Sequence, residues 1–498
     1  MKKILIANRG EIAVRVSRAC RDMGIPVAVV YSDADRASLH VLEADEAVRI
    51  GPAPALESYL NIDAVIDAAR SVGATAVHPG YGFLAENWAF AKRCEDEGLK
   101  FIGPSSDALH LVGDKIRSRE TMLAEGVPII PGMLGAPGSD AECIDKANEM
   151  GYPVLVKASA GGGGKGMQVV REEGDLLNAM ETARRVAKSA FGDDTVYIEK
   201  LIERPRHIEF QVLADEHGNV VHLFERECSI QRRHQKIVEE SPSTAVDPDL
   251  RARMGETAVK AAHAVGYANA GTVEFLLDED GSYYFLEVNA RIQVEHPVTE
   301  FVTGVDLVRE QIKVASGEKL SMTQEDLVQR GHAIECRIYA EDPANGFLPS
   351  SGKILSLLEP AGPGVRHDCG IYEGWEVPVH YDPILSKLIV HAADREAARL
   401  KMLRALSEFA ILGIATTIDY LREIIESDAF ARGETQTDFI EKHMANRHSD
   451  GPDDDVVHAA LIAGALSLSA EAGRRVAGRR RELSPWDTLG GWTIGREK

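Results

Sequence analysis

The chain has 498 residues and a formal net charge of −22, from 78 acidic against 56 basic side chains. Ordinary domain sizes predict two to four domains for this length, and the negative charge excludes broad binding to nucleic acid or anionic membranes, because their phosphates would be repelled. The six cysteines lie far apart, without the paired spacing of a zinc site or the density of a disulfide scaffold, so we expect a reducing, cytoplasmic location.

Residues 1–113 alternate between strand-like and helix-like patterns. The apolar run KILIAN (3–8) precedes helical spacing over residues 11–24, and a second apolar run, VAVVYSD, begins at residue 27. This pattern predicts a strand, helix, strand unit with parallel strands, repeated to about residue 113 as an open doubly wound sheet. A dinucleotide-binding fold is a weaker alternative, because only Gly10 stands at the first turn. The N-terminus has no long apolar stretch with a cleavage site, so we do not expect secretion.

A helical connector over residues 114–130 and a small domain over residues 131–203 are expected next. The small domain contains YPVLVKASAGGGGKGMQVV, in which four consecutive glycines lie between two apolar runs and leave backbone N–H groups open to phosphate oxygens. It is not a Walker A loop, because Gly166 follows Lys165 where Ser or Thr is required. We expect a flap over nucleotide phosphates. The alternative, a flexible surface linker, is disfavoured by Lys157 at the end of the preceding strand.

The third predicted domain, residues 204–445, mixes strands and helices. It contains PRHIEFQVLAD, VVHLFERECSIQ, a helix from about residue 249 to 266 and the hairpin-like TVEFLLDEDGSYYFLEVN. From residue 446 the composition changes to an acidic start, an apolar segment too short to span a bilayer, an arginine cluster and SPWDTLGGWTIG. We expect residues 446–498 to form a helical and basic tail that docks partner subunits.

The segment FLEVNARIQVEHPVTE alternates polar and apolar residues from Phe285 on. If it stays extended, its odd-numbered residues share one face and its apolar even-numbered residues face the other way. The polar face then carries Glu287, Asn289, Arg291, Gln293 and Glu295. An ordinary half-buried strand with one wet face is the alternative, although such faces seldom combine two acids, two amides and an arginine.

The preceding strand supplies another carboxylate. With DEDG (278–281) as the loop, Glu274 pairs near Phe285, so Glu274 and Glu287 become diagonal neighbours with Cβ atoms about 7–8 Å apart. Two like charges this close are costly unless a cation lies between them, and carboxylates with an amide oxygen suit Mg²⁺ or Mn²⁺. We therefore expect Glu274, Glu287 and Asn289 to hold divalent ions beside nucleotide phosphates.

The segment CSIQRRHQKIVEE concentrates polar and basic residues in an acidic chain, namely Gln231, Arg232, Arg233, His234 and Lys236. In isolation, an exposed basic turn explains this run equally well. Beside a metal and a phosphate flap it indicates anion recognition. Taken alone, His207 is more often a structural histidine, and Arg337 has no distinguishing context.

Eight motifs together carry a resemblance to a known family. They are IANRGEIA, HPGYGFLAEN, FIGPS with GDK, YPVLVKASAGGGGKGM, PRHIEFQVLAD, ECSIQRRHQKIVEE, EVNARIQVEHPVTE and GHAIECRIYAEDP. On these motifs the chain closely resembles biotin carboxylase, of the ATP-grasp superfamily, to about residue 445. The resemblance implies an α/β fold (α+β overall), with an N-terminal doubly wound parallel sheet domain, a small glycine-flap lid domain and a larger mixed C-terminal domain. Other ATP-grasp enzymes share this architecture but not the motifs.

The resemblance also implies roles for the matching positions. Nucleotide phosphates or ribose would be held by Lys115, Lys157, His207 and Gln231, with Glu199 and Lys200 near the adenine, Gly163 and Gly164 in the closing flap and His234 in the anion-recognising segment. The metal ligands would be Glu274, Glu287 and Asn289. Bicarbonate would be bound by Lys236, Arg291, Gln293 and the backbone of Val294. Glu295 would be the general base, and Arg337 would stabilise the enolate-like oxygen of biotin.

The implied reaction uses ATP, Mg²⁺ or Mn²⁺, bicarbonate and biotin. Bicarbonate would be activated as carboxyphosphate and its carboxyl group passed to biotin. No Met-Lys-Met biotin-acceptor motif occurs in the sequence, so we expect biotin on a separate biotin carboxyl carrier protein, a carboxyltransferase as a further partner, and a homodimer. Acetyl-CoA is the favoured final acceptor, with propionyl-CoA, another acyl-CoA and pyruvate left open.

Two other functions remain as alternatives. One is an ATP-grasp ligase that joins a carboxylate to an amine or thiol, which shares the flap and metal clamp but needs no bicarbonate-sized cluster. The other is an inactive scaffold that holds partner subunits, which the intact acidic pair and base argue against. Neither alternative explains ARIQVEHPVTE together with CRIYAEDP.

Overall fold

The computed structural model describes residues 1–133, 139–159 and 167–445, with a few helical residues between 455 and 466. The chain divides into two units, Met1–Ala445 and Asn446–Lys498, which are considered separately. The tail expected to dock partner subunits lies almost wholly outside the described residues. Within the described ranges, no helix combines the length and apolar character needed to cross a membrane.

A parallel five-stranded sheet forms the N-terminal part, with strand order β3-β2-β1-β4-β5. Ile4 and Ile6 of the first strand pack with α1, whereas Leu5 packs with α3 and α4 on the opposite face. This alternation confirms the doubly wound sheet. Its strands are β1 (Ile4–Ile6), β2 (Val27–Ser32), β3 (Glu46–Gly51), β4 (Ala76–His78) and β5 (Lys100–Phe101). Its helices are α1 (Gly10–Asp22), α2 (Leu39–Glu43), α3 (Ile62–Ser71), α4 (Trp88–Asp96) and α5 (Ser106–Gly113).

The glycine-rich part has a small antiparallel sheet with strand order β7-β6-β8. Its elements are α6 (Lys115–Ala124), α7 (Asp140–Met150), β6 (Val154–Ala158), β7 (Gln168–Val170), α8 (Leu176–Phe191) and β8 (Val196–Lys200). A strand therefore follows the glycine run and pairs with the strand before it, as expected. The run itself, with Gly163 and Gly164, lies outside the described residues.

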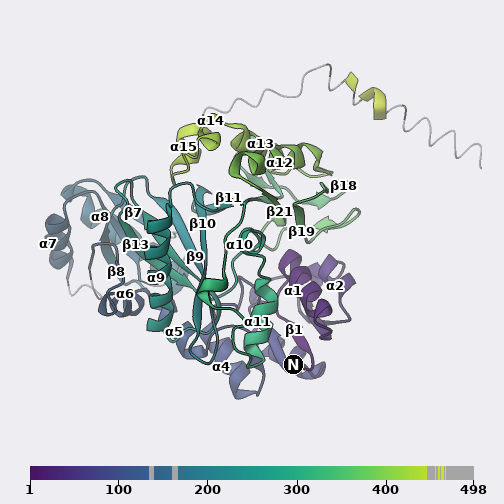
Figure 1. The fold of residues 1–498 in the computed structure, drawn as a ribbon, viewed down its shortest axis with the longest axis horizontal. Coiled ribbons are helices and arrows are strands. Elements are labelled where there is room, and N and C mark those ends of the chain that lie inside the picture. The colour runs from purple at the N-terminus through teal and green to yellow at the C-terminus, as the bar shows by residue number, and fades with distance from the viewer. Residues whose placement is uncertain are drawn as a thin grey trace, which may run out of the picture. The chain divides into compact units, whose positions relative to one another are not determined.

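The central element is an eight-stranded antiparallel sheet with order β13-β12-β9-β10-β11-β14-β21-β19 (Figure 1). Its first strands are β9 (Arg206–Ala214), β10 (Val220–Arg232), β11 (Gln235–Ser241), β12 (Asn269–Leu277) and β13 (Tyr283–Asn289). The last three are β14 (His332–Tyr339), β19 (Val365–Cys369) and β21 (Ile384–Ala392). Helix α9 (Pro248–Ala264) covers one face, packing on Phe210 and Phe275, while α11 (Leu307–Ala315) packs with Leu213 and Ala270 on the other.

Shorter elements complete the first unit. Helix α10 (His296–Thr303) follows the loop after β13, and α12 (Arg395–Glu408), α13 (Ile418–Glu426), α14 (Asp428–Ala431) and α15 (Phe439–His443) lie near the end. Three two-stranded sheets pair β15 (Glu341–Asp342) with β16 (Leu348–Pro349), β17 (Gly352–Lys353) with β20 (Glu376–Val377), and β18 (Ser356–Leu358) with β22 (Ala410–Leu412).

The β12–β13 pair differs from the sequence expectation in two ways. Glu274 lies directly opposite Glu287 rather than diagonal to it, because the pairing shifts between Glu274 and Phe275. Such a bulge cannot be read from the loop position alone. The expected extended segment to residue 295 is also wrong, since β13 ends at Asn289 and α10 begins at His296. The residues between them turn away from the strand direction.

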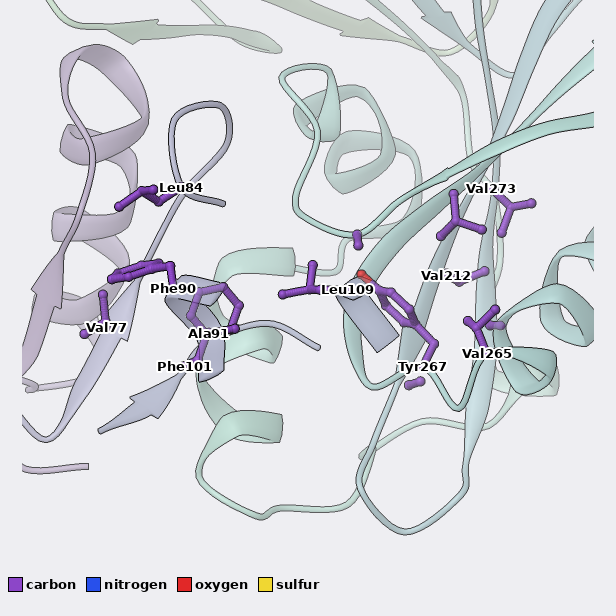
Figure 2. Packing of buried hydrophobic residues seen from close by; sticks show 14 of the residues in the cluster. Val77, Leu84, Phe90, Ala91, Phe101, Leu109, Val212, Val265, Tyr267 and Val273 are labelled. Atoms are coloured by element: carbon purple, nitrogen blue, oxygen red, sulfur yellow. The ribbon is translucent and has the colours of Figure 1, made fainter. Parts of the chain in front are cut away.

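One apolar core joins the N-terminal sheet to the central sheet. Val77, Phe90 and Phe101 from the N-terminal part belong to the same buried cluster as Tyr267 and Val273 from the central part (Figure 2). The rings of Phe90 and Phe101 meet edge to face, with centroids 5.9 Å apart. Because this packing is continuous, the N-terminal part and the central sheet form one close-packed body, and the side chains on the central sheet are held in place by both.

Candidate functional site

The site begins with a row of charges across four strands of the central sheet. In register, Arg226 lies opposite Glu209, Glu209 opposite Glu274, and Glu274 opposite Glu287. On β9, Glu209 alternates with Phe210, which packs under α9, so the row lies on the sheet face away from that helix. Three carboxylates side by side require cations to balance them.

Lys236 supplies one of these cations. Its Nζ atom donates to Glu209 Oε2 at 2.5 Å, Glu274 Oε1 at 2.8 Å and Glu295 Oε1 at 2.8 Å. Burial works against the charged amine, but the three carboxylates outweigh it and hold the pKa of Lys236 well above its ordinary value. The ammonium group is therefore charged, and it links both acidic strands to the loop that precedes α10.

Glu295 lies between two cations. It is fully buried, and besides Lys236 it accepts a hydrogen bond from Arg337 Nη2 at 3.0 Å and a weak one from Cys228 Sγ at 3.7 Å. Burial favours the neutral acid, yet Lys236 and Arg337 hold the pKa of Glu295 well below its usual range. Glu295 is therefore in the unprotonated form that a general base requires across the physiological pH range.

Arg337 has a second carboxylate partner. Its Nε atom donates to Glu239 Oε1 at 2.5 Å, and Glu239 lies opposite Glu335 across the β11–β14 pair. Burial and the charge of Glu295 outweigh Arg337 and raise the pKa of Glu239 to about 7. Burial likewise raises the pKa of Glu335 well above normal, and neither of its carboxylate oxygens has a hydrogen-bond partner among the described residues.

The expected nucleotide and metal ligands gather around Glu274. His207 Nε2 lies 3.1 Å from Glu274 Oε2, and Gln293 Nε2 lies 3.3 Å from Oε1. On the other side of the imidazole, Gln231 Nε2 is 3.1 Å from His207 Nδ1. Burial opposes ionisation of Glu274, but Lys236 and His207 hold its pKa well below normal.

Glu287 and Asn289 form the more open end of the row. Lys115 Nζ lies 3.3 Å from Glu287 Oε2, and about a third of the Glu287 side chain is exposed (34%). Asn289 Oδ1 accepts from Arg291, and its buried Nδ2 has no partner among the described residues. Two cross-strand carboxylates with an adjacent amide form an oxygen ligand set that fits Mg²⁺ or Mn²⁺.

Arg291 and Val294 lie in the loop that leads to Glu295. The Arg291 guanidinium donates to Glu86 Oε2 at 3.0 Å and to Gln293 Oε1 at 2.8 Å. The Val294 carbonyl accepts a hydrogen bond from the fully buried Lys387 at 2.7 Å. Both ends of the loop are therefore fixed by charged side chains from other elements.

A second group of predicted residues lies on the three-stranded lid sheet. Lys157 Nζ is 2.5 Å from Glu199 Oε2, and Arg119 also pairs with Glu199. Burial would raise the pKa of Glu199, but Lys157 and Arg119 lower it. Lys200 instead donates to two backbone carbonyls, of Gly151 at 2.9 Å and of Tyr152 at 3.3 Å.

The structure brings half of the predicted residues into one hydrogen-bonded and ion-paired network, which comprises His207, Gln231, Lys236, Glu274, Asn289, Arg291, Gln293, Glu295 and Arg337. Val294 lies between Gln293 and Glu295 in the chain. Glu287 lies opposite Glu274 in the sheet, and Lys115 contacts Glu287. His234 stands apart, exposed in the turn between β10 and β11.

Five residues of the site were missed by sequence reasoning: Arg226, Glu209, Glu239, Glu335 and Lys387. Glu209 could have been found, because it follows His207 by two positions on a strand and must share its face. Lys387 interrupts the apolar strand ILSKLIVHA, and such a buried charge requires partners. The pairing of Glu239 with Glu335 depends on strands that are distant in sequence, which no local pattern reveals.

Family comparisons agree with this architecture. The model described as "Biotin carboxylase, N-terminal domain" matches residues 1–109, "Carbamoyl-phosphate synthase L chain, ATP binding domain" matches 114–323, and "Biotin carboxylase C-terminal domain" matches 335–442. Together these ranges include every residue of the hydrogen-bonded network.

Similar proteins bear related names. The "Biotin carboxylase" of Nostoc sp. is 54% identical over 88% of this chain and 98% of its own length. A pyruvate carboxylase subunit of Methanothermobacter thermautotrophicus is 57% identical over 89% of this chain and 90% of its own length.

Solved structures are similar throughout the first unit. The biotin carboxylase from Campylobacter jejuni, solved as a "beta-gamma-ATP" complex, is 49% identical with a TM-score of 0.87, over 89% of this chain and 99% of its own. The biotin carboxylase domain dimer of Hydrogenobacter thermophilus 2-oxoglutarate carboxylase, solved with MgADP, ADP and bicarbonate, is 49% identical with a TM-score of 0.86, over 89% and 98%. On these matches, the chain is an ATP-grasp ligase that belongs to the biotin carboxylase family.

Proposed function

We propose that this chain uses ATP and bicarbonate to carboxylate biotin held on a separate carrier protein. The observation that carries the proposal is the position of Glu295, an ionised and buried carboxylate placed between Lys236 and Arg337. A proton acceptor here lies within one hydrogen-bonded network with the expected nucleotide ligands. That proximity is what the transfer of a phosphoryl group to a small oxyanion requires.

In the first step, Glu295 accepts the proton of bicarbonate, and a carbonate oxygen attacks the γ-phosphorus of ATP, releasing ADP and forming carboxyphosphate. A carboxylate of low pKa is a weak base. Arg291 and Lys236 offset this by stabilising the additional negative charge of the carbonate as the proton leaves. Gln293 and the Val294 backbone orient the anion.

In the second step, carboxyphosphate breaks down to CO₂ and phosphate, and the phosphate takes the proton from the ureido nitrogen of biotin. That nitrogen then attacks CO₂ to form carboxybiotin. Arg337 stabilises the oxygen that becomes negative when the nitrogen is deprotonated. Closure of the lid over the nucleotide excludes water, which would otherwise consume the intermediate.

The proposal places the nucleotide beside Glu274 and Glu287. His207, Gln231, Lys115 and Lys157 bind the phosphates or ribose, and Glu199 and Lys200 lie near the adenine. His234 and the glycines Gly163 and Gly164 belong to the same proposal. Glu274, Glu287 and Asn289 would hold Mg²⁺ or Mn²⁺, which supplies charge neutralisation at the phosphoryl oxygens when bound.

Steady-state release of ADP tests this function. We expect a rate that requires bicarbonate and divalent metal and rises when free biotin is added. ATP hydrolysis indifferent to bicarbonate would favour an ATP-grasp ligase that joins a carboxylate to an amine or thiol. A chain that binds ATP but never releases ADP would favour a scaffold.

The partners belong to the proposal as well. We expect a biotin carboxyl carrier protein, a carboxyltransferase and a second copy of this chain, in a cytoplasmic setting. Exposed leucines at the two-stranded β18–β22 sheet, Leu355, Leu358 and Leu412, offer apolar surface for a contact with another chain. Acetyl-CoA is the first candidate acceptor. Pyruvate is the second, since one relative is named as part of a pyruvate carboxylase, and assay of the co-purified carboxyltransferase with each acceptor distinguishes them.

A further inference from the structure

The edge strand β19 carries two different sets of side chains on its two faces. Arg366 and Asp368 are paired with each other on one face, and Asp368 Oδ2 lies 3.8 Å from Lys387 of the active-site network. His367 and Cys369 alternate with them and so project from the opposite face. The proposed reaction makes no use of this second face.

A third residue, Glu359, completes a cluster there. Its Oε2 atom lies 2.6 Å from His367 Nδ1. One carboxylate oxygen of Glu359, one ring nitrogen of His367 and the sulfur of Cys369 all lie within 4.8 Å of one another. The His367 side chain is only 5% exposed, whereas that of Glu359 is 50% exposed, so the cluster opens to solvent on the carboxylate side alone.

The imidazole of His367 is incompletely satisfied. Its Nε2 atom is buried and has no hydrogen-bond partner among the residues that the structure describes. The ring packs edge to face against Phe409, with centroids 4.9 Å apart, which fixes its plane. A simple surface ion pair with Glu359 would need neither a buried ring nor a thiol beside it. Metal binding at the cluster would replace the contact of Nδ1 with Glu359 and the weak hydrogen bond that Cys369 Sγ donates to the Ile371 carbonyl at 3.3 Å.

The three ligand types select for a particular kind of metal. A thiolate with an imidazole is a borderline-soft set, which suits Zn²⁺ and related ions better than Mg²⁺. Bond lengths of about 2.0–2.3 Å in a tetrahedral zinc site place ligand atoms roughly 3.3–3.8 Å apart. The Glu359 Oε2 and His367 Nδ1 atoms, which are 2.6 Å apart, therefore have to separate by about 0.7 Å, and rotation of the half-exposed Glu359 side chain can supply this movement.

We propose that Glu359, a ring nitrogen of His367 and Cys369 form a Zn²⁺ site, with water as the fourth ligand. Binding releases the proton of the Cys369 thiol to solvent and forms a zinc–thiolate bond, with no change in oxidation state. Burial raises the pKa of the Cys369 thiol to about 12, so the thiol keeps its proton until a metal displaces it. The nearby Arg18 is engaged with Glu43 at 3.2 Å.

The test uses the full-length protein with excess Mg²⁺, which saturates sites built from oxygen ligands. Co²⁺ serves as the spectroscopic probe, because a cobalt–thiolate bond gives a charge-transfer band in the near ultraviolet. Dialysis against Zn²⁺ followed by metal analysis gives the stoichiometry. We expect the band in the wild type, one bound zinc per chain, and displacement of Co²⁺ by Zn²⁺.

Variants assign the signal to its ligands. Cys369→Ser should abolish the band, and Glu359→Gln, at a half-exposed position that does not threaten folding, should weaken binding about tenfold or more. Cys143→Ser, at a buried cysteine in α7, is the matched control and should keep the band. We do not expect Cys228 to give the cobalt band. Its neighbour Glu295 already has a cationic partner, the ammonium group of Lys236.

Two results overturn the proposal. One is a wild type that shows no band and no bound zinc. The other is a band that persists in Cys369→Ser or an affinity unchanged in Glu359→Gln, which would place the metal elsewhere.

Discussion

Arg337 Nη2 donates a hydrogen bond to Glu295 Oε2 across 3.0 Å, linking strand β14 to the N-cap residue of α10. The pair joins the residue proposed to stabilise the biotin oxygen to the residue proposed to deprotonate bicarbonate. Because Glu295 is also held by Lys236, each of its oxygens has a separate cationic partner. The proposed mechanism therefore couples its two half-reactions through one carboxylate.

Glu295→Gln should bind ATP normally but turn over slowly. The amide keeps the size of the side chain, replaces one acceptor oxygen with an NH₂ group and removes the basicity, so we expect turnover to fall by about 10²–10⁴-fold. Nucleotide affinity from equilibrium binding and ADP release measure the two effects. Glu256→Gln, at an exposed position on α9, is the control. Wild-type turnover in Glu295→Gln would rule out its role as the base.

Glu239 should contribute to the pH dependence of the reaction. Its pKa is about 7, so it becomes ionised as the pH rises through neutrality and then holds Arg337 more firmly. Arg337 and Glu335 from β14, together with Glu295 and Lys236, are the charged and titratable groups that face it. The ratio of wild-type to Glu239→Gln turnover should therefore rise between about pH 6 and 8. A constant ratio would contradict this coupling.

Asp35 should be important for stability rather than for chemistry. It is fully buried and accepts hydrogen bonds from Arg9 Nε at 2.7 Å and Tyr59 at 2.7 Å. Burial opposes its charge, but Arg9 lowers the pKa of Asp35 to about 2. The folded pKa lies below the ordinary 3.8. The stability that ionised Asp35 adds to the folded state is therefore complete above about pH 4 and is lost as the pH falls toward 2.

Asp35→Asn should accordingly destabilise the fold by on the order of 3 kcal/mol at neutral pH, because it leaves Arg9 buried without its charge partner. The thermal unfolding midpoint measures the loss. Asp33→Asn, which removes an exposed partner of Arg49, should lower the midpoint much less. Equal effects of the two variants would show that burial is not the cause.

Lys387→Met should weaken the use of bicarbonate. The lysine fixes the Val294 carbonyl and lies 3.4 Å from Glu11, so its removal frees the loop that carries Val294 and leaves Glu11 without that cation. We expect the KM for bicarbonate to rise about tenfold or more, with a smaller effect on the KM for ATP. Lys401→Met is the control, since Lys401 also donates to backbone carbonyls but away from the site. Unchanged bicarbonate kinetics would refute this role.

Much of the fold follows from local patterns in the sequence. The apolar runs at Ile4–Ile6 and Val27–Ser32 predict buried parallel strands, and the structure has them. The carboxylates Glu274 and Glu287 are also brought together as expected. Their register is not predictable from the loop, because a bulge beside Glu274 shifts the pairing.

Other features depend on contacts that are distant in sequence. Alternation alone places Glu295 on a strand, whereas it lies at the start of a helix, where Lys236 and Arg337 reach it from two other strands. The cluster of Glu359, His367 and Cys369 escapes a search for paired cysteines, because it contains a single cysteine. Its carboxylate, Glu359, comes from outside the strand that carries the other two residues.

Transfer of labelled carbon from bicarbonate to biotin tests the central claim most directly. The protein is incubated with ¹⁴C-bicarbonate, MgATP and free biotin, and the label in carboxybiotin is compared with the ADP released. The account predicts label on biotin that increases with ADP and disappears when ATP is omitted or when Glu295→Gln replaces the wild type. ADP formed while biotin stays unlabelled would contradict it.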